Sequence, residues 1–176
     1  MMTKPSLLAT FLFTATLLGG CAVADDGAPS GEELGTQKSE LATVFSLKAR
    51  HSGKCLAWTS QFTFQTTCDG SAAQRWRRDG NLLRNDAFPT YCLDIPGSSQ
   101  ADGVQAQIYP CNGGLNQQFE FRTATVNPSG EATSYYVIAK HSDKCLDVEN
   151  ASLSNGAHVN QFHCHGATNQ QWLTVF

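Results

Sequence analysis

The chain has 176 residues, which is room for one domain. Hydrophobic residues make up 41% of it and charged residues only 15%, and its 15 glycines favour short strands and turns over helices. The formal net charge of −3 provides no basic surface, so nucleic acid is not an expected partner.

The N-terminus has the features of a targeting segment. Lys4 precedes an apolar stretch over residues 7–18, which is shorter than the roughly 20 residues that a permanent membrane helix needs. The stretch leads into the sequence LGGC at 18–21, which resembles the cleavage box of bacterial lipoproteins. The resemblance implies a signal peptide over residues 1–20 and a lipid on the sulfur of Cys21. An ordinary signal peptide beside a stray cysteine is the alternative.

Residues 21–41 are expected to form an acidic, flexible tether. Beyond Cys21 they read ADDGAPSGEELGTQKSELAT, with almost no large apolar group, and such a stretch cannot bury enough surface to fold. Ala22 in place of Asp after the cysteine resembles an outer-membrane sorting signal. We therefore expect an exported chain, anchored by its lipid at a bacterial outer membrane or cell surface, with its folded domain over residues 42–176.

Three copies of one sequence unit fill this domain. The segment ARHSGKCL at 49–56 returns as AKHSDKCL at 139–146. Each copy has a Cys-Leu pair, a later cysteine and a Gln-x-aromatic triplet, and its short alternating runs between Gly, Asn, Asp and Pro indicate strands. One copy of about 40 residues cannot bury its own apolar face, whereas three around a pseudo-threefold axis can. The sequence predicts an all-β fold, a β-trefoil of three pseudo-repeats, with residues 123–134 forming a surface hairpin or loop.

Six cysteines follow Cys21, two in each copy. The repeat favours pairing within each copy, and an oxidising compartment would preserve such bonds. None of the cysteines has CxxC spacing, which disfavours a zinc site. The expected internal disulfides are Cys55–Cys68, Cys92–Cys111 and Cys145–Cys164, each stabilising the fold by about 3 kcal/mol.

The copies resemble the ricin-type B-chain lectins, also described as family 13 carbohydrate-binding modules. The resemblance covers essentially all of residues 42–176, and three triplets at one offset from the cysteines are a strong signal. It implies a sugar site with an acid after Cys-Leu, an aromatic ring two residues before the second cysteine, an amide two residues before the ring, and a later Asn-Gln pair. The residues that carry it are CLDI at 92–95, CLDV at 145–148, and the triplets at 74–76, 117–119 and 170–172.

A ring can stack on the apolar face of a sugar while the acid and amide groups orient its hydroxyls. Taken alone, an acid after a strand cysteine could merely shape a turn; the complete sets favour binding. Because Asn160 stands where Gln is usual, its contact is expected to be lost or bridged by water, which leaves copy two the better site. The candidate sugar-binding residues are Asp94, Gln107, Tyr109, Asn116 and Gln117 in copy two, and Asp147, Asn160, Phe162, Asn169 and Gln170 in copy three.

Copy one departs from the pattern, with Ala57, Phe64, Thr66 and Ala73 at the acid, amide, ring and Asn positions. We interpret it as structural only, which sets the expected valency at two. The triplet aromatics are expected to pack in the core and the triplet glutamines to bond backbone, with those of copies two and three also serving the site. These residues are Trp76, Phe119, Trp172, Gln74, Gln117 and Gln170.

The histidines raise the question of a metal. His163 and His165 would face the same side of a strand, but Cys164 between them belongs to a disulfide. We interpret these two and His158 as solvated polar groups beside the sugar cleft. His51 and His141 occupy equivalent places, which indicates a structural role. No metal or cofactor is expected.

No catalytic residue is expected either. Asp94 and Asp147 belong to different copies, which separates them by more than the ~5–10 Å that glycosidase carboxylates require. The sequence contains no G-x-S-x-G or H-E-x-x-H motif.

The sequence thus predicts a membrane-displayed lectin for galactose-like sugars. One alternative is an accessory or cell-binding subunit of a toxin-like assembly, acting through protein contacts. The cell-binding subunits of cytolethal distending toxins resemble this chain in being exported, partly lipidated, ricin-like trefoils. An enzyme acting on glycosides is a third reading. Two intact site sets favour the glycan as partner.

Overall fold

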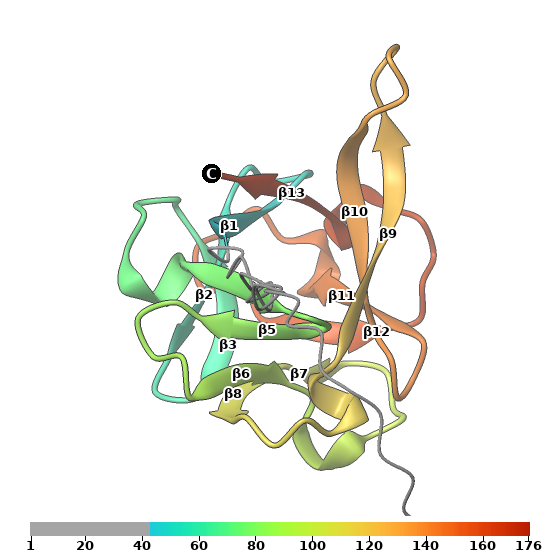
Figure 1. The fold of residues 1–176 in the computed structure, drawn as a ribbon. Coiled ribbons are helices and arrows are strands. Elements are labelled where there is room, and N and C mark those ends of the chain that lie inside the picture. The colour runs from blue at the N-terminus through green and yellow to red at the C-terminus, as the bar shows by residue number, and fades with distance from the viewer. Residues whose placement is uncertain (1–42) are drawn as a thin grey trace, which may run out of the picture. The chain divides into compact units, whose positions relative to one another are not determined.

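The computed structural model describes residues 43–176 (Figure 1). The predicted signal peptide of residues 1–20, the predicted lipidation site Cys21 and the predicted tether lie outside the described residues. We call the three repeats lobes one, two and three. None of the helices within residues 43–176 is long and apolar enough to cross a bilayer.

Strands and short 3-10 helices (η) build the lobes. Lobe one comprises β1 (Val44–Ala49), β2 (Cys55–Thr59), β3 (Phe62–Thr66), η1 (Ala72–Gln74) and β4 (Trp76–Asp79). Lobe two comprises β5 (Leu82–Asn85), β6 (Tyr91–Asp94), η2 (Pro96–Ser98), β7 (Val104–Gln105), β8 (Gln107–Pro110), η3 (Leu115–Gln117) and β9 (Phe119–Val126). Lobe three comprises β10 (Ala132–Ala139), β11 (Lys144–Val148), η4 (Glu149–Ala151), β12 (Val159–Phe162), η5 (Thr168–Gln170) and β13 (Gln171–Val175).

The strands join in one antiparallel sheet system that closes lobe three against lobe one. β1 pairs with β13, from Ser46 opposite Val175 to Ala49 opposite Trp172, and it also pairs with β2 and β4. This closure leaves the three lobes around a shared interior, so the predicted all-β trefoil is confirmed.

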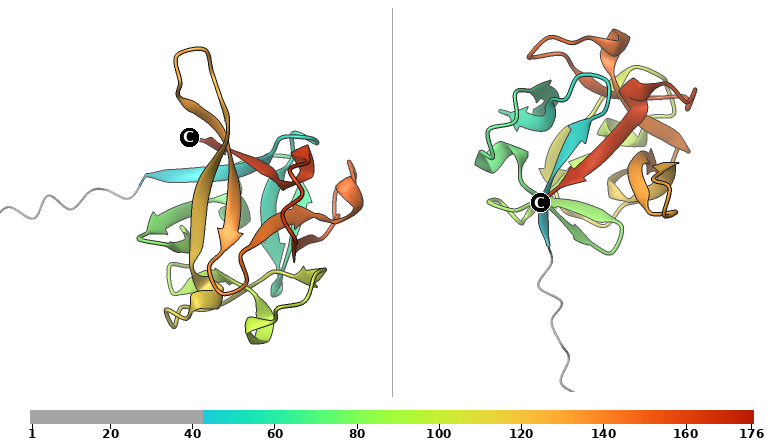
Figure 2. Two further views of the ribbon diagram at one scale, coloured as in Figure 1. Left: turned by 90° about the vertical axis from the view of Figure 1, so that its right-hand side faces the viewer. Right: turned by 90° about the horizontal axis from the view of Figure 1, so that it is seen from above.

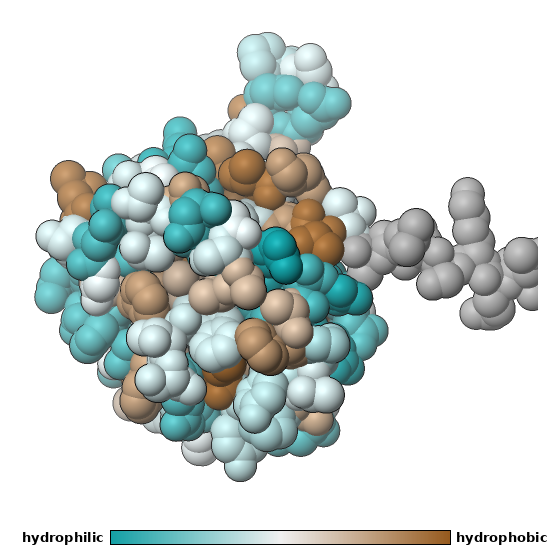
Figure 3. Space-filling view, turned by 90° about the vertical axis from the view of Figure 1, so that its left-hand side faces the viewer, coloured by the Kyte–Doolittle hydropathy of each residue, from teal (hydrophilic) through white to brown (hydrophobic). Residues whose placement is uncertain are grey.

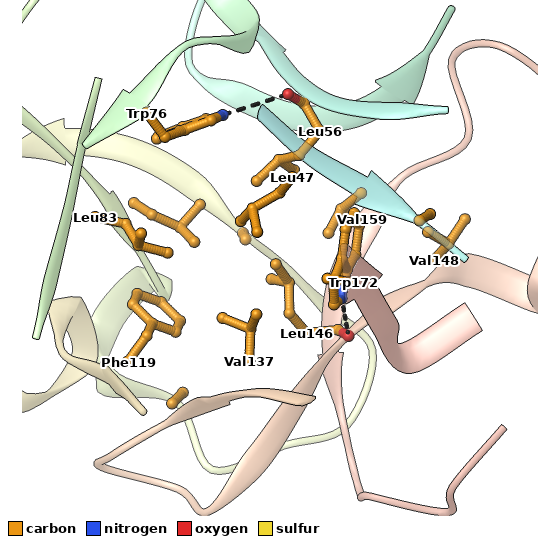
Figure 4. Close-up of a cluster of buried hydrophobic side chains, with 14 of the residues drawn as sticks. Leu47, Leu56, Trp76, Leu83, Phe119, Val137, Leu146, Val148, Val159 and Trp172 are labelled. Carbon is orange, nitrogen blue, oxygen red and sulfur yellow. Dashed lines mark hydrogen bonds between the residues drawn. The ribbon is translucent and has the colours of Figure 1, made fainter. Parts of the chain in front are cut away.

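The core draws side chains from all three lobes, as Figure 4 shows. Trp76, Phe119 and Trp172 are fully buried in it, as predicted for the triplet aromatics. The indole N–H of Trp76 donates to the carbonyl of Leu56 at 3.4 Å, and that of Trp172 donates to the carbonyl of Leu146 at 3.0 Å. Both bonds satisfy a polar group that would otherwise be stranded in an apolar interior.

The three predicted disulfides are confirmed. Their Cα–Cα distances are 5.0, 5.1 and 5.1 Å for Cys55–Cys68, Cys92–Cys111 and Cys145–Cys164, within the usual range for such bonds. In each lobe the bond ties the Cys-Leu strand to the segment that follows the next long strand.

Residues 123–134 form the expected surface hairpin. β9 and β10 pair antiparallel from Ala139 opposite Phe119 out to Ala132 opposite Val126, with two register shifts near the tip. The hairpin extends away from the lobes (Figure 2). On the molecular face seen in Figure 3, polar residues surround small, separate groups of apolar ones.

Candidate functional site

The acid and amide positions of each lobe lie directly opposite each other across an antiparallel strand pair. Asp94 on β6 is paired with Gln107 on β8, and Asp147 on β11 with Asn160 on β12. The same register in lobe one places Ala57 opposite Phe64. Directly opposed residues project from the same face with their Cβ atoms about 5 Å apart, so the sheet itself brings acid and amide together.

In lobe two, three side-chain amides hold the carboxylate of Asp94. Gln107 donates to its Oδ1 at 2.8 Å, while Asn116 and Gln117 donate to its Oδ2 at 2.8 and 3.0 Å. Asp94 is only 2% exposed, and a buried carboxylate requires such donors to compensate its lost hydration. The amides therefore fix the acid in one orientation.

Lobe one supplies a support that the sequence did not reveal. The side-chain amide of Gln61, in the turn between β2 and β3, donates to the Oε1 of Gln107 at 2.5 Å. This bond turns the nitrogen of Gln107 toward Asp94. Gln61 belongs to no repeated motif, so only the packing of lobe one against lobe two could identify it.

These groups border an open hollow of about 350 Å³. Tyr109 lies at its rim with 46% of the side chain exposed, rather than turned into the core. An acid, two amides and an exposed ring thus meet at one shallow pocket. Its lining consists of Asp94, Gly97, Ser98, Gln107, Tyr109, Asn112 and Asn116.

Lobe three repeats the arrangement with fewer donors. Asn169 donates to Oδ2 of Asp147 at 2.9 Å, and Nε2 of His165 lies 3.4 Å from the same oxygen. Burial raises the pKa of Asp147 above its ordinary value, against the lowering effect of Gln170, His165 and Asn169. Asn160 makes no side-chain hydrogen bond within residues 43–176, and its buried Oδ1 has no partner there.

The hollow of lobe three is larger, about 450 Å³. The ring of His165 meets that of Phe162 edge-on, with centroids 6.1 Å apart. Its lining consists of Asp147, Glu149, Asn150, Ala151, Asn160, Phe162, His165, Ala167, Asn169 and, from lobe two, Gly103. Glu149 was not among the sequence-predicted residues.

Three of the four histidines of lobe three, at positions 158, 163 and 165, have separate carboxylate partners. His165 lies beside the cleft, as the sequence interpretation held, near Asp147. His158 is 3.4 Å from Glu149, and His163 is 2.8 Å from Asp102 of lobe two. Across residues 43–176 no three His, Cys, Asp or Glu side chains are grouped as a metal site would require.

The triplet glutamines bond backbone in all three lobes, as predicted. Each accepts from the amide that follows the second cysteine of its lobe: the Oε1 of Gln74, Gln117 and Gln170 lies 2.9, 2.8 and 2.9 Å from that nitrogen. All three residues are fully buried. Gln117 also donates to Oδ2 of Asp94 at 3.0 Å, so this buried residue serves the site by holding the acid, and neither Gln117 nor Gln170 is among the residues that line the pockets.

Lobe one brings no acid to the equivalent place, where Ala57 and Phe64 face each other. Phe64 instead borders a separate shallow hollow with Phe62 and His158. His51 and His141 make matching contacts, each with Nε2 3.0 Å from a backbone oxygen, that of Ser152 and that of Ser99. Their equivalent positions and matching bonds support the structural role predicted for them.

Family models of the ricin-type β-trefoil lectin domain match residues 43–132, and those of the related lectin domain-like group match residues 115–175. The chain belongs to the ricin-type β-trefoil lectin domain family, whose members bind carbohydrate.

Solved structures with this fold are similar over about three quarters of the chain. The designed threefold-symmetric protein ThreeFoil has 35% identity and a TM-score of 0.67, with 76% of this chain and 98% of that one covered. An exo-β-1,3-galactanase from Clostridium thermocellum has 29% identity and a TM-score of 0.65, with 76% of this chain covered. The match spans 30% of the galactanase. A ricin B-like lectin from Macrolepiota procera, solved with lactose, shares the fold at 13% identity and a TM-score of 0.61. The match covers 76% of this chain and 95% of that lectin.

Proposed function

We propose that the chain is a bivalent lectin that binds galactose-like sugars through lobes two and three. The observation that carries the proposal is the convergence of Asp94, Gln107 and exposed Tyr109 on one hollow. A ring for the sugar's apolar face beside a fixed acid and amide for its hydroxyls is the chemistry that saccharide recognition needs. The lactose bound by the Macrolepiota lectin and the galactan cleaved by the galactanase support a galactose-like ligand.

The proposed role is binding without turnover. Hydrolysis of a glycosidic bond uses two carboxyl groups on opposite sides of the scissile bond. The hollow of lobe two is lined by one, Asp94, whose oxygens are both occupied by amide donors. In lobe three the second carboxylate, Glu149, faces His158. Incubation of the chain with galactosides, followed by analysis for released sugar, would contradict this part if product accumulated.

Display on a membrane through a lipid on Cys21 completes the proposal. Two weak sites on one domain, repeated over many anchored copies, would gain affinity by avidity. Mass spectrometry of the chain produced in a bacterial host should find diacylglycerol on Cys21, and a Cys21→Ala variant should lack it. An unmodified Cys21 would leave the lectin proposal standing and remove the anchor.

A glycan array tests the binding proposal. The full chain should bind galactose-terminated glycans, and Asp94→Ala and Asp147→Ala should each weaken that binding. The double variant should abolish it while thermal unfolding shows that the fold persists. Failure of the native chain to bind any glycan, or undiminished binding by the folded double variant, would overturn the proposal and favour a protein partner.

A further inference from the structure

In the part of the chain that the structure describes, lobe three has hydrogen-bond acceptors without a partner, whereas the equivalent acceptors in lobe two are all paired. In lobe two, Oε1 of Gln107 accepts from Gln61, and the nitrogen of Gln107 reaches Oδ1 of Asp94. Asn160 is one methylene shorter and makes neither bond. Within residues 43–176, its Oδ1 has no partner although the residue is only 4% exposed, and no hydrogen bond reaches Oδ1 of Asp147.

A second carboxylate borders the same hollow. Glu149 occupies the place that Pro96 has in lobe two, two residues after the acid and at the start of the 3-10 helix that follows. Its side chain is 45% exposed and lies 3.4 Å from Nδ1 of His158. The hollow of lobe three is therefore bordered by two carboxylates and by Asn160, whose buried Oδ1 has no partner among the described residues, whereas that of lobe two has one carboxylate with both oxygens bonded.

Few hydrogen-bond donors or cationic groups face the carboxylates of this hollow. His165 and Asn169 approach Asp147 at Oδ2, and Gln170 is the further side-chain donor that lowers the pKa of its carboxyl. Nδ1 of His165 faces the backbone amide of Ala167 at 3.3 Å, which makes Nδ1 the acceptor and places the proton of the neutral ring on Nε2. Lys144 is engaged with Asp102. The groups near the hollow that can become cationic are His165 and His158.

We propose that lobe three selects a glycan bearing a primary ammonium group, such as a deacetylated hexosamine, while lobe two takes a neutral hexose. The inference rests on the proposed lectin function and assigns different ligand classes to its two sites. An ammonium group has three N–H donors and no acceptor, which matches the unpaired oxygens of Asn160 and Asp147. A neutral hydroxyl has one donor and brings no positive charge of its own to the carboxylates.

The electrostatics of Asp147 agree with this assignment. Burial raises the pKa of its carboxyl, because the ionised form has lost hydration that the surrounding donors do not fully replace. A cation at Oδ1 of Asp147 would replace part of the hydration that the ionised carboxyl has lost. Acetylation of the amine removes both the charge and two of the donors, so an acetamido sugar should lose the advantage.

The test is a site-resolved titration of the full chain with galactosamine, galactose and N-acetylgalactosamine. Nuclear magnetic resonance signals of the Asn160 and Gln107 side-chain amides report the two lobes separately. At Asn160, galactosamine should bind about ten- to a hundredfold more tightly than the other two sugars, the range expected for hydrogen bonds to a charged group. At Gln107, no comparable preference for the amine is expected. Added salt should reduce the preference at Asn160.

Two variants and a control sharpen the result. Glu149→Gln removes one charge from the hollow, and Asn160→Gln restores the arm that lobe two has; both should reduce the preference for galactosamine. Glu131→Gln removes a carboxylate from the β9–β10 hairpin, where it accepts from Asn127, and should leave the preference intact.

The possible failures are distinguishable. Galactose binding at Gln107 without an amine preference at Asn160 would overturn this inference and leave the proposed function standing. A preference that survives both Glu149→Gln and Asn160→Gln would also overturn it. If none of the three sugars shifts either signal, the galactose-lectin proposal fails as well.

Discussion

Gly114 packs against the side chain of Asn116 so closely that a Cβ atom at Gly114 would lie 2.6 Å from Oδ1 of Asn116. The same Cβ would lie 3.0 Å from Oδ1 of Asn112. The φ of Gly114 is −58°, so the backbone would accept any residue and the constraint is space alone. In lobe three the equivalent residue is Ala167.

Asn116→Ala should weaken sugar binding by lobe two. The change removes a donor to Oδ2 of Asp94, and one hydrogen bond to a charged group is worth about 1.5–3 kcal/mol. We expect at least a tenfold loss of affinity at lobe two in a sugar titration. Gly114→Ala should cost far less, because Ala167 in lobe three leaves Asn169 its bond to Asp147 at 2.9 Å. Equal affinity of Asn116→Ala and the native chain would show that Asn116 is dispensable.

Tyr109→Ala should reduce affinity without destabilising the fold. The side chain is 46% exposed and contributes little to the core, whereas stacking of its ring on a sugar is expected to contribute about 1 kcal/mol. Titration should show roughly a fivefold loss of affinity at lobe two, and thermal unfolding should be nearly unchanged. A large fall in melting temperature would instead assign the ring a packing role.

Lowering the pH should weaken sugar binding by lobe three before it unfolds the domain. The pKa of Asp147 is raised above its ordinary value of 3.8 by burial, so the acid loses its charge at a higher pH than an exposed carboxyl does. Because the folded-state pKa exceeds the unfolded one, its contribution to stability is fully present below the unfolded pKa and is lost as pH rises through the folded pKa. Protonating Asp147 thus removes a binding group and favours the fold.

Asp102 responds in the opposite sense. Hydrogen bonds from Lys144 and His163 lower its pKa to about 2, so the stability it contributes is present above its ordinary pKa and is lost as pH falls toward about 2. A titration from neutral pH downward, followed by sugar binding and circular dichroism together, should show binding at lobe three lost while the domain is still folded. Simultaneous loss of both signals would contradict this order.

Removal of the lobe-one disulfide should separate stability from binding. Replacing Cys55 and Cys68 together by alanine should lower the free energy of unfolding by about 3 kcal/mol, as measured by denaturant titration. Sugar affinity should remain under conditions where the variant is folded, because the two pockets lie in the other lobes. Replacing Cys92 and Cys111 should affect both properties, since Tyr109 precedes Cys111 by two residues. Equal affinity losses in both pairs would indicate that lobe one takes part in binding directly.

The fold could be predicted from the sequence because the chain contains the same sequence unit three times. The alignment of Cys55, Cys92 and Cys145 predicted the disulfides and the core aromatics, and the family resemblance predicted that Asp94 and Gln107 share a site. These features depend on strand register, which is local and periodic. The repeat also predicted that copy one lacks an acid, and Ala57 opposite Phe64 agrees with that interpretation.

The contacts that could not be predicted join side chains from different elements, and no sequence motif links those elements. Gln61 supports Gln107 across a lobe boundary, and Glu149 reaches the hollow from a short 3-10 helix whose counterpart in lobe two begins with Pro96. Gln117 and Gln170 could be placed only in part. Their position in the motif predicted that they bond backbone and also serve the site, but not that the turn after each second cysteine wraps around their side chains and buries them.

A crystal structure of the chain soaked with galactose would show directly whether lobe two binds sugar as proposed. We expect a sugar whose apolar face lies on the ring of Tyr109 and whose hydroxyls bond Asp94 and Gln107. Galactose bound instead in the hollow of Phe62, Phe64 and His158, or a hollow at Asp94 left empty at saturating sugar, would contradict it.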